Sequence, residues 1–204
     1  GIEPRVSMRW LLSPDVSLKA SYSRMNQYVH SISNSFMDLP TDSWMPVTNK
    51  LKPLVSDQIS LGGYYNWNQL LDFSVEGYYK RMNNLLEYKD GYSLIPSSVS
   101  WENKMASGEG RAYGVEFMVR KQTGKTTGWV GYALAWADRQ FDEINKGRRY
   151  PSRYDNRHKL NIVVMHKLSK KVELSAAWTY SSGNYTTLSL ENYYPSDHLH
   201  QPGE

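Results

Sequence analysis

The chain has 204 residues, enough for one sizeable domain, and its net charge of +4 is too small and too evenly spread to form a nucleic-acid-binding patch. It contains no cysteine, which excludes disulfides and thiolate metal sites. The mean hydropathy is −0.64 and no apolar run approaches the roughly 18 residues of a spanning helix. A helical membrane protein is therefore excluded, whereas a membrane barrel is not, because its alternating strands average to a polar score.

Strict alternation of apolar and polar residues predicts eight strands, each about ten residues long. The first, for example, places Val6, Met8 and Trp10 on one face and Arg5 and Arg9 on the other. Strands of this length are long for a compact soluble domain. In chain order the predicted strands cover about 5–12, 16–24, 58–65, 71–80, 111–120, 128–139, 159–167 and 172–181.

The connections between these strands alternate between short and long, with long polar segments at about 25–56, 82–110 and 140–157 and after the eighth strand. Short periplasmic turns and long extracellular loops are typical of an outer-membrane barrel. Outward-facing rings at strand ends are typical of membrane interfaces. They are predicted near the long loops at Tyr22, Tyr79, Tyr113, Trp136 and Tyr180, and near the short turns at Trp10, Tyr65 and Trp67.

A soluble antiparallel sandwich would also alternate, but its strands would be shorter and its rings would not gather at the strand ends. The pattern therefore favours an all-β fold, an antiparallel up-and-down transmembrane meander of about eight strands. Eight strands could close by themselves around a filled interior, or they could form a sector of a wider pore with a hydrated lumen. Polarity alone leaves both open, because the inward face carries Arg5, Arg9, Lys19, Asp72, Glu76, Lys80, Glu116, Arg120, Lys159, Lys167 and Glu173.

Six segments resemble the C-terminal barrel of TonB-dependent outer-membrane receptors, in order and with similar spacing over nearly the whole chain. The most specific pieces are the GVEF strand at 114–117, the Asp57-Gln58 strand start, and Tyr154-Asp155 followed by Arg157-His158. The resemblance is greatest to the branch whose members often have a carboxypeptidase-regulatory-like N-terminal extension. The segments are ASYSRMNQYVH, LPTDSWMPV, KPLVSDQISLG, FSVEGYYKRMNNLLEYKDG, GEGRAYGVEFMVRKQTGKTTGW and RYPSRYDNRHKLNIV.

The resemblance implies a 22-stranded barrel in the outer membrane of a Gram-negative bacterium, filled by an N-terminal plug domain. Such receptors import scarce ligands such as siderophores, cobalamin or glycans with energy delivered by TonB. Residues 1–204 are expected to be a partial barrel domain that lacks the plug and the closing strands. The alternative is a self-closed eight-stranded structural barrel or adhesin.

The implied partners are outer-membrane lipid and lipopolysaccharide, TonB through the missing N-terminal region, and a small-molecule or glycan ligand. A surface lipoprotein is a further candidate partner. No nucleic acid and no cofactor is expected.

Aromatic rings on the long connections are the candidate ligand-binding residues, because rings stack on flat apolar or sugar ligands. The same rings could equally pack the loops against one another. The basic segment 145–159 could contact lipopolysaccharide phosphates or an anionic substrate; a solvated loop, fastened to the strand mouth by Asp155 and Arg157, is favoured. The predicted ligand-binding residues are Tyr28, Trp44, Tyr92, Trp101, Arg149, Tyr150 and Tyr154.

Catalytic and metal sites are not expected. His158 lies near Asp155 in the sequence, but no spacing places a serine nucleophile beside it, and a triad is defined by geometry. His198 and His200 have strand spacing but lack a carboxylate partner, which makes a poor metal site. The GEGRAYG segment has no following helix and so does not predict a phosphate-binding loop.

Overall fold

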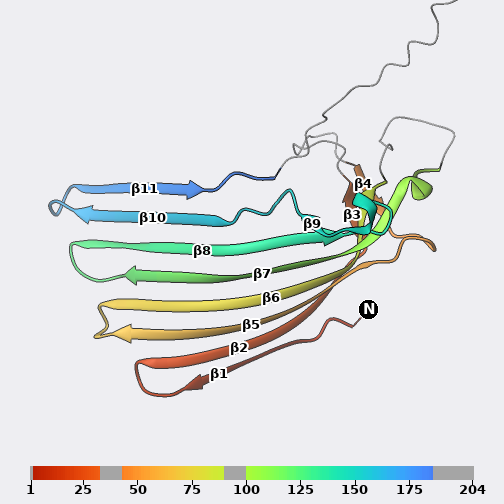
Figure 1. Cartoon of the computed structure of the whole chain (residues 1–204). Coiled ribbons are helices and arrows are strands. Elements are labelled where there is room, and N and C mark those ends of the chain that lie inside the picture. The colour runs from red at the N-terminus through yellow and green to blue at the C-terminus, as the bar shows by residue number, and fades with distance from the viewer. Residues whose placement is uncertain (1, 33–42, 90–99, 186–204) are drawn as a thin grey trace, which may run out of the picture.

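The structure, a computed structural model, describes residues 2–32, 43–89 and 100–185. The alternating segments form one antiparallel sheet in which each main strand pairs with its neighbours along the chain, an up-and-down meander (Figure 1). The eight main strands, in spatial order, are β1 (Arg5–Leu11), β2 (Val16–Gln27), β5 (Leu54–Trp67), β6 (Leu71–Tyr88), β7 (Met105–Lys121), β8 (Thr126–Gln140), β10 (His158–Lys167) and β11 (Glu173–Ser181).

The remaining elements lie within the long connections. A two-residue strand, β9 (Tyr150–Pro151), pairs with β8, and a separate hairpin is formed by β3 (Val29–Ile32) and β4 (Ser43–Pro46). Two short 3-10 helices, η1 (Trp101–Lys104) and η2 (Asn145–Gly147), complete the described elements. None of the helices in these ranges is long and apolar enough to span a membrane.

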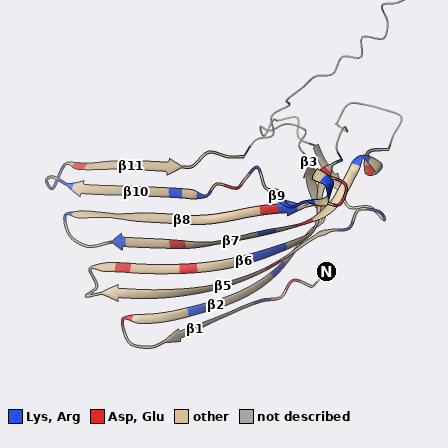
Figure 2. Cartoon of the chain, in the orientation of Figure 1, with Lys and Arg blue, Asp and Glu red and all other residues tan. Residues whose placement is uncertain are grey.

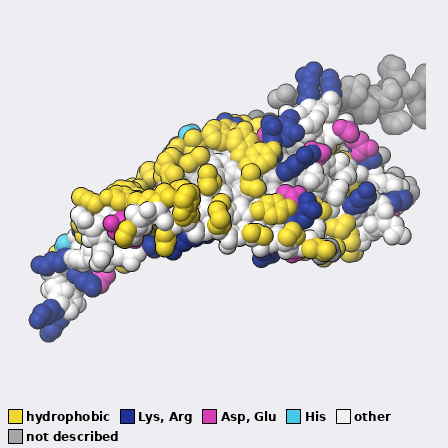
Figure 3. Space-filling view, turned by 90° about the horizontal axis from the view of Figure 1, so that it is seen from below, with side chains coloured by type: hydrophobic (Ala, Val, Ile, Leu, Met, Phe, Trp, Pro, Cys, Tyr) yellow, Lys and Arg dark blue, Asp and Glu magenta, His cyan; other side chains and the backbone are white. Residues whose placement is uncertain are grey.

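The predicted faces of the sheet are confirmed by the strand register. One row across the sheet joins Trp10, Leu18, Gly63, Val75, Phe117, Tyr132, Leu160 and Tyr180 on the outward face. Within the described part of the chain no second layer covers the outward face: Met8 and Leu61 are each 64% exposed and Leu174 is 57% exposed. Figure 3 shows apolar side chains spread over the sheet, with basic side chains gathered mostly towards the two ends. A soluble sandwich would instead bury this face.

The sheet is an open arc. Within the described residues β1 pairs only with β2, and β11 pairs only with β10. The four short turns lie together at one end, and the described parts of the long connections lie at the other (Figure 1). An eight-stranded barrel that closed on itself would pair β1 with β11, so the open arc favours a sector of a wider barrel.

The two strands beside the second long connection, β6 and β7, are longer than predicted. β6 has 18 residues and β7 has 17, so both run into the segment at 82–110 that was predicted to be a connection. In β6 the physical reason is a bulge: Asn84 has a φ of 61°, its side-chain Nδ2 donates to the Pro53 carbonyl at 2.9 Å, and the register shifts between Asn83 and Leu85. Since a bulge breaks the alternation of faces, the period-two signal ends before the strand does.

Candidate functional site

The described parts of the long connections pack into a cap at one end of the sheet. All six buried hydrophobic side chains of the described residues lie in this cap. One core contains Leu85, Ala106, Phe141 and Ile144, with Leu54, Met82 and Tyr150 packed against it. The other contains Leu51 and Met105, with Met45, Leu86, Tyr88 and Trp101 packed against it.

Tyr150, a predicted ligand-binding residue, is a half-buried part of the cap. Its ring stacks on Phe141 with the ring centroids 6.3 Å apart. Its hydroxyl donates to Oε2 of Glu87 at 3.1 Å, and Arg139 donates to the same oxygen at 3.2 Å. These contacts join β6, β8 and the third long connection, so Tyr150 holds the cap together.

Arg149 and Tyr154 lie on the same connection in different surroundings. Arg149 donates from Nη1 to Asp138 at 2.5 Å and from Nη2 to Gln140 at 2.9 Å, which fastens it to β8. The Tyr154 side chain is 53% exposed, and the guanidinium of Arg153 lies 4.7 Å from its ring centroid. Tyr154 therefore has an exposed ring, whereas the Arg149 guanidinium is bound to side chains of β8.

The other predicted ligand-binding residues divide in a similar way. Trp44 on β4 is 67% exposed, and Tyr28, just before β3, is 44% exposed. Trp101 begins η1 and packs against the core around Leu51. Tyr92 lies outside the described residues. The accessible rings of this set are thus Tyr28, Trp44 and Tyr154.

His30 is a cap residue that no sequence signal indicated. It is 4% exposed, and its Nε2 atom has no hydrogen-bond partner among the residues that the structure describes. Burial lowers the pKa of the His30 imidazole below 6.5, and the backbone of Lys52, as a hydrogen-bond partner, opposes this shift. His30 therefore stays neutral over a wider pH range than an exposed histidine.

Acidification is expected to loosen the β3–β4 hairpin. Because the folded pKa of His30 is lowered, the stability contributed by the neutral ring is complete above about 6.5 and is lost as the pH falls from 6.5 through the folded pKa. Once the pH dependence of the intrinsic exchange rates is corrected for, the β3 and β4 amides should be less protected from hydrogen exchange at a pH of about 5 than above about 6.5. His30→Gln should remove this pH dependence, and an equal dependence in that variant would assign it to another group.

His158, the histidine considered for catalysis, is bound to a tyrosine and not to Asp155. Nδ1 of His158 is hydrogen-bonded to the Tyr132 hydroxyl at 2.8 Å, and Asp155 instead accepts from Arg157 at 3.2 Å. That bond raises the pKa of the Arg157 guanidinium. Among the described residues, no three His, Asp or Glu side chains are grouped so as to hold a metal ion, while His198 and His200 lie outside those residues.

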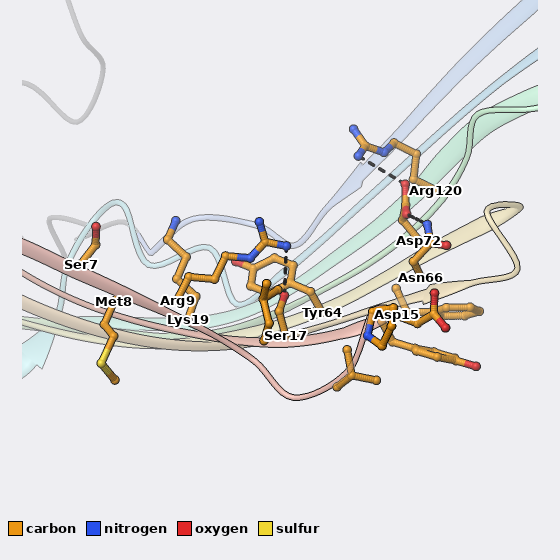
Figure 4. Close-up of a pocket in the computed structure, with 15 residues that line it drawn as sticks. Ser7, Met8, Arg9, Asp15, Ser17, Lys19, Tyr64, Asn66, Asp72 and Arg120 are labelled. Atoms are coloured by element: carbon orange, nitrogen blue, oxygen red, sulfur yellow. Dashed lines mark hydrogen bonds and ion pairs between the residues drawn. The ribbon is translucent and has the colours of Figure 1, made fainter.

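A hollow of about 560 Å³ lies far from the cap, around the β1–β2 turn. Figure 4 shows the side chains of Arg9, Lys19 and Arg120 on one side of the strands and Met8 on the other. Arg9 donates to Ser17 at 3.4 Å. Because its lining comes from both faces, this hollow follows the open edge of the sheet and does not form a single binding site.

A sheet with an apolar lipid-facing side, a polar side and a packed cap at the long-connection end defines an outer-membrane barrel protein. The family model described as TonB dependent receptor-like, beta-barrel, matches residues 2–203. The chain therefore belongs to this family, which confirms the resemblance to the barrel of TonB-dependent receptors; the branch with the N-terminal extension stays a prediction. Members of the family are receptors and transporters of the Gram-negative outer membrane, not enzymes. A search of curated proteins finds no match.

Proposed function

We propose that this chain forms part of the barrel wall of a receptor that imports a scarce nutrient of the siderophore, cobalamin or glycan class with energy from TonB. TonB acts through an N-terminal region, and the sheet is one sector of a 22-stranded barrel that a plug domain fills. The other partners are lipid and lipopolysaccharide around the wall and a surface lipoprotein over the cap.

The observation that carries this proposal is the arrangement of charges on the inward face. Arg9 lies directly opposite Lys19, and Glu76 lies directly opposite Glu116. Like charges opposite each other destabilise a strand pair unless water or another partner screens them. A self-closed eight-stranded barrel would pack these groups in a filled interior. A wide lumen hydrates them and leaves them available to a plug.

We assign first contact with the ligand to the exposed rings Tyr28, Trp44 and Tyr154. Trp101, Tyr150 and Arg149 support them from within the cap, and Tyr92 completes the proposed set. Ordered rings lose little conformational freedom when they bind, so a packed cap favours affinity. Stacking on rings suits both flat chelates and sugar faces.

The test uses the intact receptor, with its plug, in cells that depend on one limiting nutrient. Growth on a siderophore, cobalamin or glycan source should require both the receptor and TonB. Growth that continues without TonB would contradict energised import. Growth that is independent of the receptor for all three classes would contradict the proposed function itself.

Trp44→Ala is expected to weaken ligand binding to the intact receptor by about tenfold or more, as truncation of a central aromatic contact does in other interfaces. Trp44→Phe is the matched control, because it keeps a stacking surface on the same strand, and it should lose much less affinity. Binding can be titrated by the change in intrinsic fluorescence. Equal affinity for the wild type and Trp44→Ala would remove Trp44 from the ligand site.

A further inference from the structure

A row of charged side chains lies on the outward face immediately beyond the aromatic residues. Tyr79, Tyr113 and Trp136 form one row across β6, β7 and β8, with neighbouring ring centroids 6.3 and 5.5 Å apart. The next outward position on these strands, about 7 Å closer to the cap, is occupied by Arg81, Arg111 and Asp138. Charged segments are visible at this end of β6 and β8 in Figure 2.

Two arginines of this row face each other without a carboxylate between them. Arg81 lies directly opposite Arg111, an arrangement that repulsion alone disfavours. Arg81 turns to Glu109, at 3.1 Å, and Arg111 turns to Asp138, at 2.9 Å. Both bonds from Arg111 to Asp138 leave from Nε, so its Nη1 and Nη2 groups can donate to another acceptor. The Arg81 side chain is 57% exposed and the Arg111 side chain is 40% exposed.

A third guanidinium lies one strand further along the same face. Arg157 lies 5.6 Å from the ring centroid of Trp136 and is held by the buried carboxylate of Asp155 at 3.2 Å. A hollow of about 280 Å³ opens beside it, with Tyr113, Trp136 and Arg149 among its lining residues. The basic segment 145–159 was predicted to be a solvated loop. It places Arg149 and Arg157 beside the outward-facing rings of Tyr113 and Trp136.

We propose that Arg81, Arg111 and Arg157 bind the phosphate groups of a phosphorylated glycolipid of the outer leaflet, the lipid A part of lipopolysaccharide. Guanidinium groups bind phosphate oxygens in a bidentate manner, and an anion between Arg81 and Arg111 removes their repulsion. Rings at the membrane interface support the headgroup, and exposed apolar residues continue below them for acyl chains, including Val115 and Phe117. A free phosphate would have no use for this apolar surface.

This inference rests on the proposed function only for placing the sheet in the outer membrane. The intact receptor, purified in detergent, is titrated with bisphosphorylated lipid A, with dephosphorylated lipid A and with inorganic phosphate. The Arg81→Gln/Arg111→Gln double variant should bind bisphosphorylated lipid A about tenfold or more weakly than the wild type. Lys80→Gln is the matched control, because Lys80 neighbours Arg81 on β6 but faces inward, and its affinity should be unchanged.

Equal lipid A affinity in the wild type and the double variant would overturn the proposal. So would equal binding of the dephosphorylated lipid, or competition by inorganic phosphate at concentrations near those of lipid A, which would identify a site for free anions. Arg111→Lys keeps the charge and should recover part of the affinity, which separates lost recognition from lost folding. Nutrient import by the wild-type receptor is a separate readout: its absence would contradict the proposed function and not the lipid site.

Discussion

Val75→Arg is expected to reduce the amount of assembled receptor in the outer membrane severely. Val75 lies in the middle of the outward, lipid-facing side of the sheet, between Gly63 and Phe117 in the register, and it is 41% exposed. An arginine at mid-depth on a lipid-facing strand costs about 2–4 kcal/mol. Leu174→Arg on the outward face of β11 should act in the same direction. The measurement is the fraction of receptor that shows heat-modifiable mobility in membrane fractions.

Ser74→Arg is the matched control for this prediction. Ser74 neighbours Val75 on β6 but faces inward, opposite Tyr64 and Met118. A charge there meets water in the lumen and should be tolerated. If Ser74→Arg and Val75→Arg reduced assembly equally, the assignment of lipid and lumen to the two faces would be wrong.

The facing of the strands was predictable because lipid and water meet the same strand on opposite sides. The need for an apolar side chain towards lipid repeats every two residues, so neighbouring positions such as Ser74 and Val75 show it directly in the sequence. The aromatic row at Tyr79, Tyr113 and Trp136 was predictable for the same reason. Local sequence is sufficient where the solvent, not another part of the chain, decides which residue fits.

The cap was not predictable in this way, because its contacts join residues far apart in the sequence. Tyr150 and Glu87 are 63 positions apart, and nothing near either residue indicates the other. The bulge at Asn84 also ends the alternation, so Leu85 and Leu86 enter the cap from positions that carry no periodic signal. For this reason the sequence could not distinguish the half-buried Tyr150 from the exposed Trp44.

Phe141→Ala is expected to open the cap while leaving the membrane portion assembled. Phe141 is 1% exposed and packs with Leu85, Ala106 and Ile144. Truncation of a buried phenylalanine to alanine costs about 3–5 kcal/mol in a well-packed core. This core has few other members, so the loss should be felt mainly as local opening. Hydrogen exchange and limited proteolysis at residues 141–157 should both become faster, with heat-modifiable mobility unchanged.

The Phe141 ring is packed closely against the backbone of β7. A Cβ atom at Gly108 would lie 2.4 Å from Cδ1 of Phe141 and 2.3 Å from the Gln140 carbonyl oxygen, so β7 approaches the ring as closely as a glycine allows. Phe141→Leu, the control, keeps an apolar side chain and should open the cap less. Since Tyr150 stacks on Phe141, ligand affinity should fall in proportion to the opening. Unchanged affinity in an opened cap would show that the exposed rings bind without support from this core.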